Sequence, residues 1–358
     1  MSSSHSILSG QESSDSIRSR SCLNCYLCGS RGEVLYESLS DRLFGAPGTW
    51  SLRRCPNPKC GMVWLDPMPL EEDICKAYRS YYTHRDDVRS AGNLAERFYS
   101  RVRKGYLYSK YGYRDDCHNR WGRVIALLAL LAFLDPVRRE RLGFNVFYLN
   151  SRTDGRLLEV GCGSGTALKS MQELGWQVEG VDFDPAAVEQ ARRKGLTVHL
   201  GKLKELKLPD ESFDAITACH VVEHITDPIG MLRECRRLLK PSGVLVLITP
   251  NAGSWGHQLF GRDWRGLEPP RHLRLFTPSS LTTMVQRGGF GVRECRTSSR
   301  GRGVFLASRR LRRTNGPIDQ TAPNVGEQLL AELMEIMEGL RSVFRSWQGE
   351  EIILMAAR

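Results

Sequence analysis

Three glycines and two carboxylates lie close together near the middle of the chain, in a pattern that suits a nucleoside ligand. Gly161, Gly163 and Gly165 follow a short apolar run, and Glu159 stands just before the first of them. Asp182 ends the next apolar segment, seventeen residues beyond Gly165. A strand, a glycine turn, a helix and a second strand with a terminal acid form a nucleoside-binding unit, in which the acid holds the ribose.

The carboxylate before the glycine turn indicates the charge of the ligand. It is a poor neighbour for a pyrophosphate and a good one for an ammonium or sulfonium group. The pattern resembles the first motif of class I S-adenosylmethionine (SAM)-dependent methyltransferases. Residues 209–228 resemble the fourth strand of that family with its following loop, and residues 238–251 resemble its fifth strand. The resemblance covers about residues 150–300 and the last strand.

This resemblance implies an α/β fold with a doubly wound, mostly parallel seven-stranded sheet of the Rossmann-like class, whose strands bind SAM at their carboxyl ends. Asp182 would accept hydrogen bonds from the ribose, and Glu159 would face the methionine amino group. Lys202 stands where the family often has an acid for adenine, so backbone groups would make that contact. The cofactor-binding residues expected from the resemblance are Glu159, Gly161, Cys162, Gly163, Gly165, Asp182, Phe183, Cys219 and His220.

A histidine-rich loop follows the expected fourth strand. His220, Glu223 and His224 match the His-x-x-Glu-His pattern of a zinc peptidase, but that pattern belongs inside a helix and here directly follows an apolar strand. The core resembles the ubiquinone-pathway O-methyltransferases, in which a similar acidic-histidine loop is linked to a divalent metal. His220 differs from the acid expected at its position. We take His220 and His224 as candidate catalytic residues.

Residues 251–277 form a long segment rich in Trp, Arg, His and Gly, without helical or strand periodicity. A long loop at the ligand edge of an α/β sheet is usually functional. We expect Trp264, Arg271 and His272 to contact the acceptor. His272 could also remove a proton, because histidine titrates near neutral pH. An equally weighted alternative is that His272 caps the helix that starts at Thr277 or bonds a backbone carbonyl.

Two pairs of cysteines near the beginning of the chain have the spacing of a metal site. Cys25 and Cys28 form the first pair, Cys55 and Cys60 the second, and a glycine follows each pair. Four thiolates complete a tetrahedron around zinc and leave no position for water, so we predict structural zinc rather than free thiols. Cys22 is an alternative ligand. Removing zinc is expected to melt this module and to leave the SAM domain folded.

The segments suggest four regions. We expect a disordered tail at 1–20, a zinc-ribbon-like module at 21–70, a helical linker or cap at 71–150, and the methyltransferase domain at 151–358, with a helical insertion at about 314–348. The second region resembles the zinc-ribbon-like module that precedes the methyltransferase domain in many bacterial proteins. The apolar face of 327–347 is expected to pack on the core or on a second subunit.

The apolar run 124–134 is too short to span a bilayer and is expected to be a buried helix. Its flanking arginines leave contact with a membrane surface open. Tyrosines and arginines within 71–150 could stack and neutralise nucleic acid, but packing on the enzyme core is favoured. Residues 300–313 hold six arginines, for which a solvated loop or helix face is the favoured interpretation.

Composition adds limits but selects no partner. The net charge of +11 over 358 residues allows an anionic partner such as RNA or a membrane surface. Eleven cysteines, an odd number, and the lack of a secretory signal predict a reducing, cytoplasmic location. The oligomeric state is not predicted.

We therefore predict a SAM-dependent methyltransferase that transfers a methyl group, to oxygen or carbon by preference, onto a small-molecule, sugar or lipid-linked acceptor. One alternative is an RNA methyltransferase that uses the basic surface and the zinc module. The other is a non-enzymatic binding or scaffold protein with the same fold, suggested by the departures at Lys202 and His220.

Overall fold

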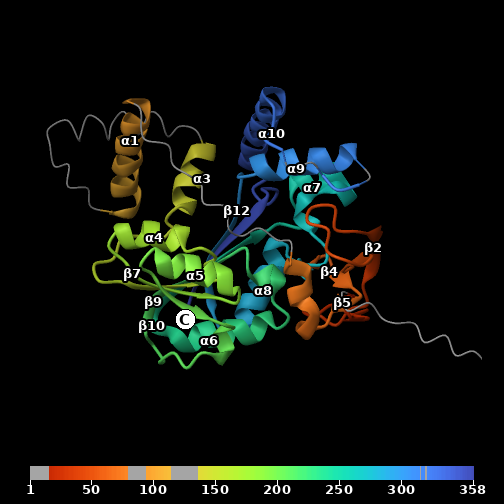
Figure 1. Ribbon diagram of the computed structural model, residues 1–358, viewed down its shortest axis with the longest axis horizontal. Coiled ribbons are helices and arrows are strands. Elements are labelled where there is room, and N and C mark those ends of the chain that lie inside the picture. Colours follow the sequence, from red (N-terminus) through yellow and green to blue (C-terminus); the bar gives the residue numbers. More distant parts are fainter. Residues whose placement is uncertain (1–15, 80–93, 114–135, 315, 319–320) are drawn as a thin grey trace, which may run out of the picture.

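A computed structural model describes residues 16–79, 94–113, 136–314, 316–318 and 321–358 (Figure 1). Its centre is a seven-stranded sheet with the order β12-β13-β10-β9-β6-β7-β8. Strands β6 to β10 pair in parallel, and β13 runs antiparallel to both neighbours, so the expected sheet and its antiparallel last strand are confirmed. The strands are β6 (Arg156–Val160), β7 (Gln177–Asp182), β8 (Thr197–Leu200), β9 (Phe213–Cys219), β10 (Leu239–Pro250), β12 (Gly291–Ser298) and β13 (Glu351–Ala357).

Helices cover both faces of this sheet because each helix buries one apolar side. Helices α4 (Thr166–Glu173) and α5 (Pro185–Arg193) pack into one core cluster, and α6 (Pro228–Leu238) and α8 (Pro278–Arg287) pack into the other. Two helix starts follow directly from the sequence. Asp184 accepts the Ala186 N–H and caps α5, and Thr277 accepts the Ser280 N–H and caps α8; a proline follows each cap.

The cysteine-bearing region forms a second sheet that also uses a strand from the other end of the chain. Strands β2 (Glu33–Leu39), β3 (Trp50–Arg54) and β4 (Val63–Asp66) are antiparallel neighbours, and β11 (Arg274–Leu275) pairs with β4. Figure 1 shows this red and orange sheet beside the central one. One core cluster contains buried side chains from both regions. The module therefore shares part of its core with the central sheet, and its melting on removal of zinc stays a prediction.

The predicted tail at 1–20 is wrong over its last residues. Strand β1 (Ser19–Arg20) pairs with β5 (Met68–Pro69), and the Arg18 guanidinium forms an ion pair of 2.8 Å with Asp73. Residues 1–15 lie outside the described residues.

The remaining helices surround the site and the upper edge of the molecule. They are the 3-10 helix η1 (Glu71–Tyr78), α1 (Leu94–Tyr111), α3 (Pro136–Phe144), α7 (Trp255–Phe260), α9 (Arg302–Arg313) and α10 (Val325–Phe344), with short 3-10 turns η2 (Leu203–Glu205), η3 (Val222–His224), η4 (Gly261–Asp263) and η5 (Arg265–Leu267). Both α9 and α10 lie between β12 and β13 in the chain. The inserted helical region thus begins near residue 302, earlier than expected.

Several expectations about these helices can be compared with the structure. Tyr111 and Tyr113 of the linker are buried, which agrees with packing rather than base stacking, whereas Tyr81, Tyr82 and the run 124–134 lie outside the described residues. The apolar face of α10 was expected to pack on the core or on a second subunit; most of it is exposed in the single chain, so packing on the core is wrong and packing on a second subunit stays a prediction. Within the described residues, we find no helix with the length and apolarity that crossing a membrane requires.

Candidate active site

The glycine turn lies at the carboxyl end of β6 and has the backbone that only glycine adopts easily. Gly161, Gly163 and Gly165 have φ angles of 70°, 53° and 74°. A side chain at Gly161 would place its Cβ 2.4 Å from Val221, whereas a Cβ at Gly163 would meet no described heavy atom within 4 Å. The backbone at Gly163 therefore borders open space, as a cradle for a ligand must.

Two buried carboxyl groups face this turn. Glu159 is 5% exposed, and its Oε2 has no hydrogen-bond partner among the described residues. Burial, together with the nearby charge of Asp182, raises the pKa of Glu159 to about 8. The two oxygens of Asp182 accept the Gly163 N–H at 2.8 Å and the Asp184 N–H at 2.9 Å. Two buried acids without a cation fit a positively charged ligand, and SAM carries both an ammonium and a sulfonium group.

The structure brings most of the other expected cofactor residues to the same strand ends. Cys162 is buried in the turn, Cys219 ends β9, and Phe183 follows Asp182 with half of its side chain exposed. The ring of Tyr78 meets Phe183 edge to face at a centroid distance of 5.4 Å. Tyr78 belongs to η1, so the cysteine-bearing end of the chain reaches the rim of the cofactor site.

A second contact from η1 involves the lysine that replaces the expected adenine-binding acid. Lys202 forms an ion pair with Glu71, whose other oxygen accepts the Thr226 hydroxyl at 3.1 Å. Sequence reasoning missed Glu71, whereas Tyr78 is one of the linker tyrosines that were expected to pack on the enzyme core. No local pattern signals Glu71, because it lies 131 residues before Lys202.

His220 lies between two carboxylates at the end of β9. Its Nε2 is 3.0 Å from Glu351, and its Nδ1 is 3.5 Å from Glu223. Desolvation lowers the pKa of His220, but these two contacts outweigh it and raise the pKa to about 10. His220 therefore carries a proton at neutral pH and cannot act as a general base there. It instead balances the charge of the fully buried Glu223, which also accepts the Thr249 hydroxyl at 2.9 Å.

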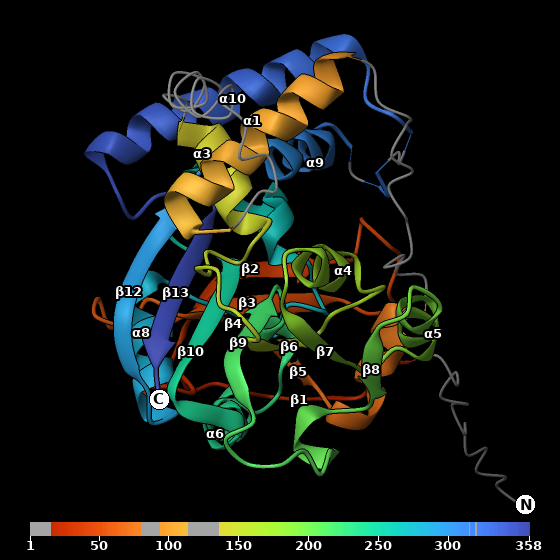
Figure 2. The ribbon, with the colours of Figure 1, turned by 90° about the vertical axis from the view of Figure 1, so that its left-hand side faces the viewer.

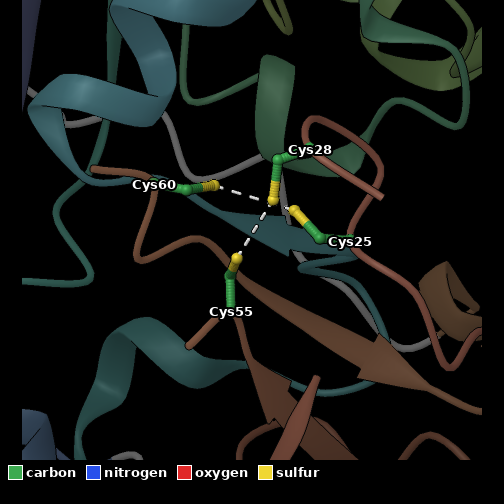
Figure 3. A group of neighbouring side chains, drawn as sticks. All are labelled: Cys25, Cys28, Cys55 and Cys60. Atoms are coloured by element: carbon green, nitrogen blue, oxygen red, sulfur yellow. Dashed lines mark hydrogen bonds between the residues drawn. The ribbon is translucent and has the colours of Figure 1, made fainter. Parts of the chain in front are cut away.

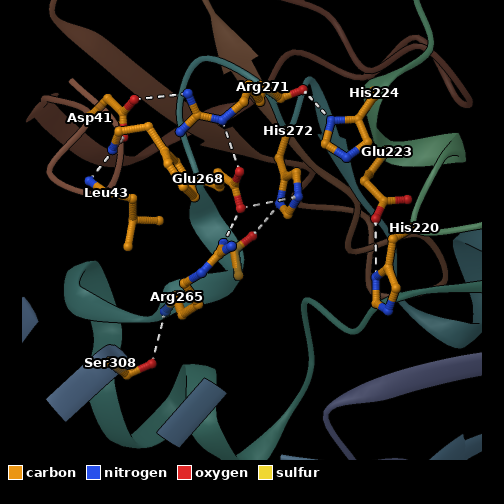
Figure 4. A network of polar contacts seen from close by, with 12 residues as sticks. Asp41, Leu43, His220, Glu223, His224, Arg265, Glu268, Arg271, His272 and Ser308 are labelled. Carbon is orange, nitrogen blue, oxygen red and sulfur yellow. Dashed lines mark hydrogen bonds and ion pairs between the residues drawn. The ribbon is translucent and has the colours of Figure 1, made fainter. Parts of the chain in front are cut away.

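The other two predicted histidines lie against each other, with ring centroids 4.8 Å apart (Figure 4). The Nδ1 atom of His224 is 3.0 Å from the Arg271 carbonyl and 2.9 Å from the Tyr78 hydroxyl. The Nδ1 atom of His272 is 2.7 Å from the Gly266 carbonyl. A carbonyl only accepts, so each Nδ1 carries a hydrogen.

This arrangement decides between the two interpretations of His272. Burial lowers the pKa of His272 to about 4, so its imidazole is neutral and a poor proton acceptor at pH 7. The expectation that it titrates near neutral pH is wrong, and the alternative of a bond to a backbone carbonyl is what the structure shows. One ligand atom each from Glu223, His224 and His272 lies within 4.8 Å of the others.

Those three side chains suit a divalent ion. A carboxylate and two imidazoles, each oriented by a carbonyl on its far nitrogen, make a typical ligand set with its supporting hydrogen bonds. Two of the three belong to the acidic-histidine loop that the resemblance linked to a divalent metal, and His272 joins them from the segment before β11.

Trp264 and Arg271 do not line an open acceptor site, contrary to expectation. Arg271 is fully buried and donates to Asp41 at 2.8 Å and to Glu268 at 2.8 Å. Trp264 is 2% exposed and donates its indole N–H to Glu350 at 2.8 Å. Both side chains hold the segment before β11 in place. Figure 4 shows Arg271 directed away from the histidine pair.

The four predicted cysteine ligands converge, as Figure 3 shows. The sulfur atoms of Cys25 and Cys60 are 3.7 Å apart, those of Cys28 and Cys55 are 3.3 Å apart, and all four lie within 4.8 Å of one another. Tetrahedral zinc with bonds of about 2.3 Å separates its sulfurs by roughly 3.8 Å, so the cluster is compatible with zinc. Cys22 lies outside the cluster.

The cysteine module also fixes the acceptor side of the site. The Cys60 carbonyl accepts the Thr277 hydroxyl at 2.7 Å. Leu273 accepts the Leu65 N–H at 3.0 Å, and its own N–H donates to the Glu223 carbonyl at 2.8 Å. The residue next to His272 is therefore held between β4 and the Glu223 loop.

Comparison with known proteins agrees with this geometry. A family model described as "Methyltransferase domain" matches residues 132–294. This part of the chain is therefore similar to SAM-dependent methyltransferase domains. The ubiquinone biosynthesis O-methyltransferase of Xanthomonas oryzae pv. oryzae is 37% identical over 143 residues, which cover 37% of this chain and 57% of that relative. A probable S-adenosylmethionine-dependent methyltransferase of Mycolicibacterium smegmatis is 35% identical over 151 residues, covering 41% and 56%.

The chain thus spans a little over half the length of the curated relatives it matches. A solved SAM-dependent methyltransferase from Mesorhizobium loti aligns with a TM-score of 0.42 and 18% identity over 61% of this chain and 98% of that one.

Proposed function

We propose that this protein transfers the methyl group of SAM to a hydroxyl oxygen of a small-molecule acceptor. The observation that carries the proposal is the pair of buried carboxyl groups, Glu159 and Asp182, at an open glycine turn. Asp182 would hold the ribose, and Glu159 would hold the methionine ammonium. The names of the relatives from Xanthomonas and Cereibacter support oxygen as the acceptor atom.

The reaction is an in-line displacement. The acceptor oxygen forms a bond to the methyl carbon while the carbon–sulfur bond breaks, and S-adenosylhomocysteine leaves with the sulfur electron pair. The acceptor proton passes to solvent. Such a step gains most from alignment of the two reactants and from a site shaped around the sulfonium.

The cluster that contains His224 and His272 would assist this displacement. Glu223, His224 and His272 would hold a divalent ion, which when bound supplies Lewis acidity to a hydroxyl group. His220 keeps Glu223 ionised and oriented, because their contact helps to lower the pKa of Glu223 to about 2 against the opposing effect of burial. His220 is thus a positioning residue in this proposal.

The four-cysteine cluster would hold structural zinc. Its sulfur spacing supports this assignment, and with four protein ligands the ion would have no open position for chemistry. Its effect on the reaction would pass through β4, β11 and the backbone that holds His272.

The test combines binding and turnover. Calorimetry should show SAM and S-adenosylhomocysteine binding to the wild-type protein, and methyl-labelled SAM incubated with cell extract should yield a labelled small molecule identified by mass spectrometry. A label found on RNA would contradict the acceptor class. Binding of SAM without any turnover would instead support the non-enzymatic alternative.

A further inference from the structure

The helix α10 exposes its apolar side and turns its charged side toward the protein. Its exposed side chains include Leu329, Leu333, Ile336, Met337, Leu340 and Phe344, which are 52% to 88% exposed. None of the exposed positions described along α10 is charged. Figure 2 shows this helix along the upper edge of the molecule, with α9 and α3 below it.

The charged residues of α10 point toward the protein instead. Glu332 pairs with Arg302 of α9 at 2.8 Å, Glu327 pairs with Arg310 at 2.8 Å, and Glu335 forms an ion pair with Arg141 of α3. Glu338 is buried and accepts the Glu350 N–H. These contacts fix the rotation of the helix, so its apolar side cannot turn inward unless they break. We call this outward side, Leu329 to Phe344, the apolar stripe.

A stripe of this length is an interaction surface. The 20 residues of α10 extend roughly 30 Å, and a continuous apolar face of that size on a soluble surface usually marks a binding site. The arginines near the apolar stripe indicate what kind of partner it binds. Helix α9 has arginines and no acidic residue, and the exposed Arg313 and Arg345 lie near the two ends of α10.

These arginines favour an anionic partner over a second copy of the chain. A two-fold dimer through the stripe would bring the same arginine groups of both copies together, with like charges in proximity. An anionic lipid surface would accept the apolar side chains and attract the arginines at once. Trp347, half-exposed just beyond the helix, is an aromatic of the kind enriched at membrane–water interfaces.

We propose that α10 lies in the surface of an anionic membrane, with its apolar stripe inserted and the exposed Arg313 and Arg345 against the lipid headgroups. This inference goes beyond methyl transfer and does not depend on it. It would place the enzyme where an acceptor dissolved in lipid is concentrated.

The test is cosedimentation with vesicles of phosphatidylcholine alone and with about 30 mol% phosphatidylglycerol, on which retention should rise about tenfold. Leu340→Glu should abolish retention. Val34→Glu is the matched control, because it adds the same charge at an apolar side chain of β2 that is 49% exposed, and it should leave retention unchanged. Arg313→Glu combined with Arg345→Glu should remove the preference for anionic vesicles while the protein stays folded.

Three results would overturn the proposal. Equal loss of retention in Leu340→Glu and Val34→Glu would show that the stripe is not the contact. A dimer in light scattering that Leu340→Glu dissociates, with no vesicle retention of the wild type, would assign the stripe to a second copy. A protein that neither dimerises nor binds vesicles would show that the stripe is covered within the chain, and the unfolding temperature of Leu340→Glu should then fall.

Discussion

The cofactor half and the acceptor half of this site are built in different ways. The cofactor half lies between Glu159 and Asp182, and adjacent parallel strands bring its two acids together. The acceptor half joins Tyr78 of η1, the loop at Glu223, and His272 before β11, and the cysteine module holds these segments in register. The two acids of the cofactor half thus come from one local motif, whereas the residues of the acceptor half come from distant parts of the chain.

The largest expected effect is confined to the cofactor half. Replacing Asp182 with Ala removes the group expected to hold the ribose, and SAM affinity in calorimetry should fall by about a hundredfold or more. The fold should persist. Asp184→Ala is the control, because it removes the cap of α5 and keeps the Asp182 carboxylate, so it should lower stability by about 1 kcal/mol and leave SAM affinity intact. Unchanged SAM binding by Asp182→Ala would remove the ribose assignment.

Loss of the metal at the cysteine cluster should break the acceptor half and spare the cofactor half. Cys55→Ser should lower methyl transfer by about a hundredfold while SAM affinity changes by less than about threefold, since only the β4–β11 register is disturbed. Cys75→Ser is the control, because Cys75 is exposed and outside the cluster. Elemental analysis of purified protein should find one zinc per chain. A zinc-free active protein would refute the assignment.

Substitution of His272 tests the ligand set of the acceptor half. His272→Ala should weaken divalent-ion binding, measured by titration with manganese, by about tenfold to a hundredfold without changing SAM affinity. His199→Ala provides a control, because that histidine contacts Glu179 at the far edge of the sheet. Equal ion affinity in both variants would exclude His272 from the ligand set.

The smallest expected effect is on the free energy of unfolding, which depends on pH through the ionisation of Glu159. Its pKa is raised to about 8 in the folded protein from 4.5, so the folded state holds a proton that the unfolded state has lost between these values. Stability of the ligand-free protein should therefore fall as pH rises from about 4.5 to 8. Glu159→Gln cannot ionise, so it should remove this slope and gain about 1–2 kcal/mol at pH 8.

Denaturant unfolding at several pH values would measure the slope, and calorimetry should show weaker SAM binding by the same variant. A slope that persists in Glu159→Gln would mean that another buried acid causes it. Glu350 is the natural comparison, because burial also raises its pKa, to about 7.

Sequence reasoning succeeded where a contact lies within a few residues of its partner. The glycine turn, the helix start at Thr277, the mostly parallel sheet with its antiparallel last strand and the four cysteines all follow from spacing or from a family pattern. These features depend on backbone conformation and on ligand geometry, which short motifs record.

Sequence reasoning failed where burial and distant partners decide the role of a side chain. Arg271 looked like a residue for the acceptor, but Asp41, 230 residues away, holds it inside the protein. His220 and His272 are both histidines in a loop, yet their surroundings move their pKa values to about 10 and about 4. The same side chain becomes a cation in one place and a neutral imidazole in the other, and only the fold separates them.

The pairing of β4 with β11 has a consequence for biosynthesis. The Cys60 carbonyl and its partner Thr277 are separated by 217 residues, so the cysteine-bearing strands leave the ribosome long before the strand that completes their sheet. Until then, their hydrogen-bonding edge stays open, and an open edge invites aggregation. Early capture of zinc by the nascent cysteines would hold that edge in shape until translation delivers its final strand.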